Sequence, residues 1–197
     1  MQGLEQMDIK VFVKKGEDIP PYDFMPVLQR WIQKHTVPGA LIDVADYSHI
    51  HNGPGIILVA HEHNVSVDYG EGRMGLLFHQ KQPLDGSLQE RMKLCMKYAF
   101  TACVELQQEP EFEGRLEFDS GKFLFIVNDR LHAPNDEETN GQVHEQLLAA
   151  AGSVYDGELD LSRRIGDARH RIMIEATAGQ SQDFRSLIER CSGTITG

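Results

Sequence analysis

The chain has 197 residues, of which 41% are hydrophobic and 25% charged, and its formal net charge is −11. This composition is ordinary for a globular protein that buries a core without disulfides or metals. The acidic balance argues against general nucleic-acid binding and against an anionic membrane surface, because both need a basic face.

We expect neither a membrane span nor a signal peptide from this sequence. No segment approaches the roughly 18 consecutive apolar residues of a membrane span, and the first residues lack the apolar core of a signal peptide. The cysteine count is three, and an odd number without a spaced framework fits a reducing compartment. We therefore expect a cytoplasmic protein that does not bind membranes.

The first half of the chain, residues 1–110, reads as a strand, a helix, four strands and a helix. Period-two alternation and turn residues predict the strands, at 8–15, 40–50, 55–62, 64–69 and 74–81. Apolar residues at helical spacing predict a helix that begins near Pro26. Ser87 and Glu90 have the spacing of a capping box, which predicts the start of a long second helix.

The second half, residues 111–197, is expected to contain two hairpins and two short helices. The patterns place a hairpin at 114–130 with its tip at Asp119-Ser120-Gly121, and a polar loop at 133–141. A helix at 142–152 precedes a second hairpin at 157–176, which turns at Gly166-Asp167. A last helix spans 181–191, with Ser181 as its cap.

These elements predict an α+β fold, with a mostly antiparallel sheet and helices packed on one face. The element order of the first half recurs at an offset of about 115 residues, which indicates either an internal duplication or two unrelated α+β runs within one compact unit. The order in the first half is similar to the TATA-binding-protein-like fold, which is also duplicated; the resemblance implies topology only. Open sheet edges and apolar helix stripes favour a homodimer.

Four histidines flank a Gly-Pro-Gly turn, as His49 with His51 and His61 with His63. The two histidines of each pair share a strand face, so each pair could chelate a divalent metal such as zinc, copper, nickel or iron. The alternative is that they are solvent-facing residues of a hairpin. Pairing around this turn would place Asp46 opposite His61.

A general acid–base site is the competing interpretation of the same region. A histidine beside a carboxylate titrates near neutral pH and can transfer protons. The candidate catalytic residues are His49, His61, Glu62 and Asp46, with Tyr47 at the same end of the sheet.

The same stretch resembles a group of bacterial proteins of unknown function. Its pattern falls here on Asp46-Tyr47-Ser48-His49, Gly53-Pro54-Gly55, His61-Glu62 and Asp68. The resemblance implies no known activity. It favours His49, His61, Glu62 and Asp68 over His51 and His63, and adds Tyr47 and Ser48 as candidate ligand-binding residues.

The predicted second hairpin carries four arginines, Arg163, Arg164, Arg169 and Arg171, beside several acidic residues. They could form a salt-bridged surface or a small anion site for a carboxylate or phosphate. The expected function is binding of a small polar or anionic ligand. The alternatives are a metal- or acid–base-dependent enzyme that uses His49, His61 and Glu62, and an interaction module without a pocket.

Overall fold

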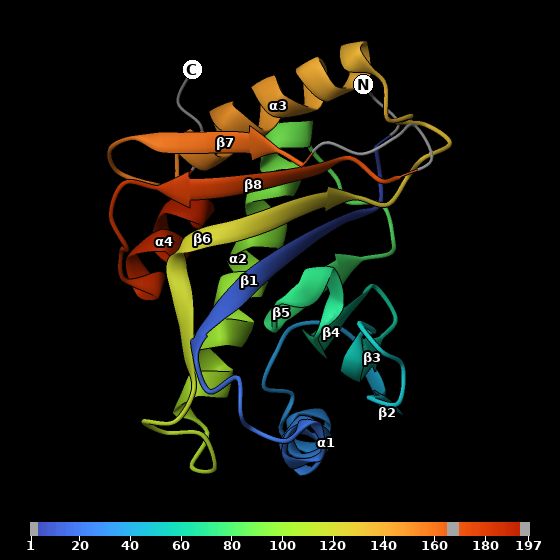
Figure 1. Ribbon diagram of the computed structural model, residues 1–197, viewed down its shortest axis with the longest axis vertical. Coiled ribbons are helices and arrows are strands. Elements are labelled where there is room, and N and C mark those ends of the chain that lie inside the picture. The colour runs from blue at the N-terminus through green and yellow to red at the C-terminus, as the bar shows by residue number, and fades with distance from the viewer. Residues whose placement is uncertain (1–3, 165–169, 194–197) are drawn as a thin grey trace.

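A single antiparallel sheet of eight strands organises the protein, in the order β2-β3-β4-β5-β1-β6-β8-β7. The computed structural model describes residues 4–164 and 170–193 (Figure 1). The strands are β1 (Met7–Lys15), β2 (Leu41–Tyr47), β3 (Gly55–Ala60), β4 (His63–Asp68), β5 (Gly75–Gln80), β6 (Glu117–Val127), β7 (Leu159–Arg163) and β8 (Met173–Ala178).

Helices in the described part of the chain pack against this sheet. They are α1 (Phe24–Lys34), α2 (Leu88–Gln108), α3 (Glu137–Gly152) and α4 (Phe184–Ser192). Each of these helices contributes buried apolar side chains to one continuous core. Figure 1 shows α2 passing behind the central strands. The α+β class with an antiparallel sheet is therefore confirmed.

The centre of the sheet joins the two halves of the chain. β1 pairs with β5 on one side and with β6 on the other, so residues 7–15 bond to strands far along the sequence. β1 and β6 are neighbouring strands, and both contribute side chains to the same core. The sheet therefore continues without interruption from residues 1–110 to residues 111–197.

The predicted hairpin at 114–130 is wrong. Residues 117–127 form one long strand whose register against β1 shifts between Val11 and Lys15. The Asp119 carboxylate accepts a hydrogen bond from the N–H of Gly121 at 3.0 Å, so the turn-like sequence makes an irregularity within β6 instead of a reversal. Figure 1 shows β6 bending sharply.

Helix ends account for two further corrections. The expected polar loop at 133–141 contains the start of α3, because the Asp136 carboxylate caps it by accepting the N–H of Thr139 at 2.8 Å. The cap of α4 is Asp183 and not Ser181. The capping box of Ser87 and Glu90 at the start of α2 is confirmed.

The two faces of the sheet differ. Ile9 and Val11 of β1 join the main core under the helices, whereas Asp8, Lys10 and Phe12 point to the opposite face, which we call the open face. A small apolar cluster lies there, formed by Phe12, Leu77, Leu124, Ile126 and Met173.

None of the helices in residues 4–164 and 170–193 is long and apolar enough to cross a membrane. All three cysteines are buried and free. Burial raises the pKa of the Cys191 thiol to about 12, and it also raises the pKa values of Cys95 and Cys103.

Candidate functional site

The Gly-Pro-Gly stretch connects β2 and β3 as a wide hairpin loop. Tyr47 pairs with Gly55, so residues 48–54 lie outside the ladder. Gly55 has φ +60°, and a Cβ there would overlap the carbonyl oxygen of Val67. The N–H of Tyr69 donates to the carbonyl of Gly53 at 3.0 Å, which fastens this loop to the connection between β4 and β5.

The four histidines do not converge. His49 and His51 lie exposed in the hairpin loop, and His61 lies exposed at the turn between β3 and β4. His63 is buried on the helix side of the sheet, where its ring packs against Phe78 with ring centroids 4.9 Å apart. Burial lowers the pKa of His63. Across the described ranges, no group of three or more His, Cys, Asp or Glu side chains is placed to hold a metal ion.

The predicted pairing of Asp46 with His61 is also wrong. Asp46 pairs with Ile56, and the N–H of His61 donates to the carbonyl of Ala40 at 2.9 Å. The loop is wider than a tight turn, which shifts the register by several residues. The hydroxyl and N–H of Ser48 both donate to the Asp46 carboxylate and lower its pKa.

Glu62 has a local structural role. Its carboxylate accepts a hydrogen bond from the N–H of Ala40 at 2.9 Å, which lowers the pKa of Glu62. Tyr47 is partly exposed at the end of β2. His49, His61, Glu62 and Asp46 therefore do not form a shared cleft.

The open face instead carries buried charged residues. Asp8 and Lys10 of β1 are exposed by only 1% and 0%, although strand alternation predicts both in solvent. The Lys10 ammonium donates to the Asp68 carboxylate at 2.5 Å and to the carbonyl of Gly70 at 2.6 Å. Burial lowers the pKa of Lys10, and the nearby Asp68 carboxylate partly offsets this effect.

A second polar cluster surrounds Asp8. Nδ1 of His79 lies 2.6 Å from one Asp8 carboxylate oxygen, and the Asn128 amide donates to the other at 2.5 Å. Arg171 then donates to the Asn128 carbonyl oxygen at 2.9 Å. The Asp8 carboxylate, as a hydrogen-bond acceptor, thus lies against Nδ1 of the His79 ring and orients it.

A pocket of about 690 Å³ lies on the open face beside Lys10, Asp68 and Arg171. Its wall is formed by the Gly-Pro-Gly loop and by Gly70–Gly72 after β4, and its floor includes Leu77 and Ile126. The polar residues that line it are Lys10, Asp68, Glu71, Asn52 and Arg171. A mostly preformed hollow with an apolar floor and a few convergent polar groups is typical of a small-molecule site.

Some of the predicted residues do meet at this pocket. Asp68 and Arg171 line it, and Arg164 lies 3.5 Å from Glu71 at its rim. Arg163 points to the other face, where it donates to the Glu137 carboxylate of α3 at 2.9 Å. Arg169 and the Gly166-Asp167 turn lie outside the described residues; the neighbouring strands β7 and β8 pair antiparallel as expected.

Sequence reasoning missed Asp8, Lys10, Glu71, His79 and Asn128. The signal for Asp8 and Lys10 was that polar residues alternate with apolar ones in the strand at 8–15. It indicates a buried site only when that strand is known to lie in the middle of the sheet, with protein on both sides.

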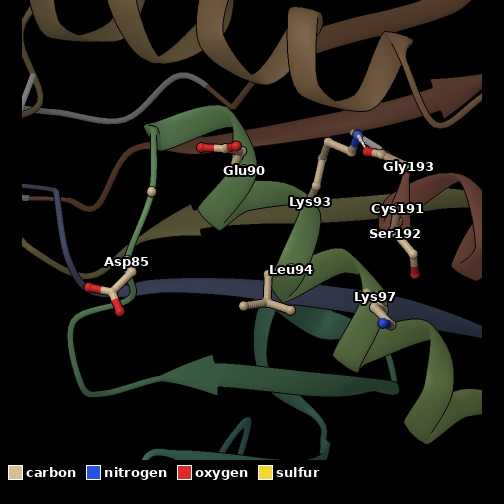
Figure 2. A pocket seen from close by; sticks show the side chains of 9 residues that line it. Asp85, Glu90, Lys93, Leu94, Lys97, Cys191, Ser192 and Gly193 are labelled. Carbon is tan, nitrogen blue, oxygen red and sulfur yellow. Dashed lines mark hydrogen bonds between the residues drawn. The ribbon is translucent and has the colours of Figure 1, made fainter. Parts of the chain in front are cut away.

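A second pocket, of about 470 Å³, lies between the start of α2 and the end of α4 (Figure 2). Lys93 and Lys97 of α2 border it, beside Cys191. The Lys93 ammonium already donates to the carbonyl of Gly193 at 2.9 Å, the dashed line in Figure 2. Among the residues that the structure describes, no buried polar network like that of the open-face pocket borders it, so we consider the open-face pocket the better site.

Comparison of the chain with protein-family models, with curated proteins and with solved structures found no match.

Proposed function

We propose that the protein binds a small polar or anionic ligand in the pocket of the open face. The observation that supports this proposal is the buried ion pair of Lys10 and Asp68, two residues that line a hollow with an apolar floor. Buried ionic groups are costly for stability and are concentrated at functional sites, where they position ligands.

The polar groups of the site are held in fixed orientations. Lys10 ties β1 to Asp68 and to the loop at Gly70, and Asn128 holds both Asp8 and Arg171. A ligand would therefore meet groups that are already ordered, which reduces the entropy lost on binding.

A nuclear magnetic resonance screen with a library of small polar compounds tests the proposal. We expect bound compounds to shift the amide resonances of Gly53, Gly70 and Gly72. Leu77→Gln should weaken binding several-fold, and Leu148→Gln, at an exposed position on α3, should leave it unchanged. A library without binders, or shifts confined to the pocket at Lys93, would contradict the proposal.

A second candidate function, acid–base catalysis, is favoured by the pair of His79 and Asp8. The His79 side chain is 27% exposed and Asp8 only 2%, so a buried carboxylate orients a solvent-accessible imidazole. We expect hydrolysis of 4-nitrophenyl acetate above the buffer rate, lowered about 100-fold in His79→Gln. A wild-type rate equal to buffer would count against this candidate.

We also infer that the two halves arose by duplication, with a TATA-binding-protein-like topology. Each half contains a strand, a helix, a hairpin and a final helix in that order, and the second half is one hairpin shorter. The antiparallel neighbours β1 and β6 are consistent with a pseudo-twofold axis between them. The proposed site then lies where the two halves meet, with Lys10 and Leu77 from one half and Ile126 and Arg171 from the other.

A further inference from the structure

Two arginines at the rim of the open-face pocket are anchored to the sheet by hydrogen bonds. Arg164 donates to the Glu175 carboxylate at 3.0 Å, and Arg171 donates to the Asn128 side chain at 2.9 Å. The Glu175 carboxylate also forms an ion pair with the Lys122 ammonium, at 2.6 Å. Both guanidinium groups are therefore held in place from the sheet side.

The other terminal nitrogen of each arginine faces Glu71. The distances are 3.5 Å from Arg164 and 3.8 Å from Arg171, one to each carboxylate oxygen. Charge-assisted hydrogen bonds of this type are about 2.7–2.9 Å long. In the part of the chain that the structure describes, Glu71 thus lies between two guanidinium groups without hydrogen bonding to either.

The backbone of Glu71 is unusual for a glutamate. It has φ 60° and ψ 21°, in the left-handed region, and it lies between Gly70 and Gly72. Glycine adopts this conformation at little cost, whereas other residues rarely do. The loop therefore holds a carboxylate at a position where glycine would be the easier residue.

An apolar surface lies beside this carboxylate. Leu77 and Ile126 line the same pocket as Glu71 and belong to the apolar cluster of the open face. A molecule with its charged end at Glu71 could place a hydrocarbon part on these two side chains.

We propose that the ligand is a small organic acid, whose carboxylate binds between Arg164 and Arg171 in the place now held by the Glu71 carboxylate. Its hydrocarbon part lies on Leu77 and Ile126. Glu71 is then an internal competitor that the ligand displaces. This inference rests on the function proposed above, and it specifies the chemical class of the ligand.

Calorimetric titration of hexanoate into the full chain tests the inference. Glu71→Gly removes the competing carboxylate and suits the positive φ, so we expect affinity at least tenfold higher than in the wild type. Glu71→Gln removes only the charge and should also tighten binding. Glu117→Gln removes an exposed carboxylate that pairs with Lys14, and it is the charge-matched control, with no change expected.

Further arms identify the groups that bind the anion. Adding Arg171→Gln or Arg164→Gln to the Glu71→Gly variant should reverse the gain at least tenfold. Butyrate should bind more weakly than hexanoate, by about fourfold for each methylene that is lost. Inorganic phosphate should bind more weakly than hexanoate, because it has no apolar part.

Several results would overturn the inference. One is that the wild type and both Glu71 variants bind hexanoate with equal affinity, or do not bind it. Another is that the higher affinity of Glu71→Gly persists when both arginines are replaced. A third is that phosphate binds more tightly than hexanoate. The function proposed above would still stand in these cases if the screened polar compounds shift Gly53, Gly70 and Gly72. It would fail separately if no compound does.

Discussion

A single buried lysine shows most clearly how this sheet departs from its sequence pattern. The Lys10 side chain is fully buried, so its charge is tolerated only because Asp68 and the carbonyl of Gly70 replace the lost water. Breaking a buried ion pair by removing one partner usually costs about 3–5 kcal/mol, because the other charge stays buried and unpaired.

Lys10→Met should therefore lower the free energy of unfolding by about 3–5 kcal/mol in urea denaturation. Adding Asp68→Asn removes the orphaned charge and should restore part of this loss. Lys14→Met breaks an exposed pair with Glu117 and should leave the free energy of unfolding close to that of the wild type. Equal effects of the Lys10 and Lys14 variants would show that Lys10 is not buried in solution.

His63 predicts a pH dependence of stability. Its pKa is lowered by burial, with a smaller opposing effect from Glu62, whereas in the unfolded chain it is about 6.5. At a pH between these two pKa values, His63 is protonated in the unfolded state but not in the native state. Stability therefore decreases as the pH falls below about 6.5.

We expect the wild type to lose stability between pH 7.5 and pH 5.5 in urea denaturation. His63→Phe keeps an aromatic ring beside Phe78 and should lose this component of the slope. His61→Gln, at an exposed position two residues away, should keep it. A His63→Phe slope equal to that of the wild type would contradict the assignment.

At the scale of elements, the loop between β2 and β3 depends on one glycine. Gly55 combines φ +60° with direct contact to the carbonyl of Val67, so a side chain is excluded both by conformation and by space. The loop also carries Gly53 and Pro54 to the pocket. Its shape therefore connects the hairpin to the proposed site.

Gly55→Ala should destabilise the protein by at least about 2 kcal/mol, as measured by thermal unfolding, and should weaken any ligand of the open-face pocket. Gly141→Ala is the matched control within α3, where no atom lies within 4 Å of the added Cβ. It should stabilise the protein by about 1 kcal/mol, because alanine favours the helix. A stabilising Gly55→Ala would refute this account of the loop.

Local signals predicted elements better than they predicted connections. The capping box at Ser87 and the alternation in 8–15 act within a few residues, and both elements form as expected. The sequence Asp119-Ser120-Gly121 has the composition of a turn, but pairing with β1 keeps it within one strand. Tertiary contacts decided between these outcomes, and they are not visible in a window of a few residues.

At the scale of the whole molecule, the two halves share one core and one sheet. The edges of the halves are the paired strands β1 and β6, so each half alone would expose a row of unpaired backbone groups. We therefore expect a single cooperative unfolding transition.

Trp31 and Cys191 report on opposite halves of the molecule. Trp31 is the only tryptophan and is buried in α1, so its fluorescence follows the first half. Cys191 is buried in α4, and alkylation resolved by peptide mass spectrometry follows the second half. The two urea midpoints should coincide, and separate midpoints would mean that the halves unfold independently.

The site was harder to predict than the fold because its residues meet only across this sheet. Lys10 and Asp68 are 58 positions apart in the sequence, and Asn128 and Asp8 are 120 apart. The four histidines around the Gly-Pro-Gly turn are close in sequence, but none of them belongs to the polar cluster of Asp8. The histidine of that cluster is His79, which lies on the open face, whereas His63 lies on the helix side of the sheet. Which face each residue occupies depends on the strand order.

The central position of β1 also has a consequence for synthesis of the chain. A ribosome makes residues 7–15 long before Gly75–Gln80 and Glu117–Val127, the two strands that pair with them. At about 5–20 residues per second, β1 waits several seconds or more for its second partner. During that interval β1 can pair with β5 but its other edge stays unpaired, so the nascent chain should be a substrate for chaperones until β6 has emerged.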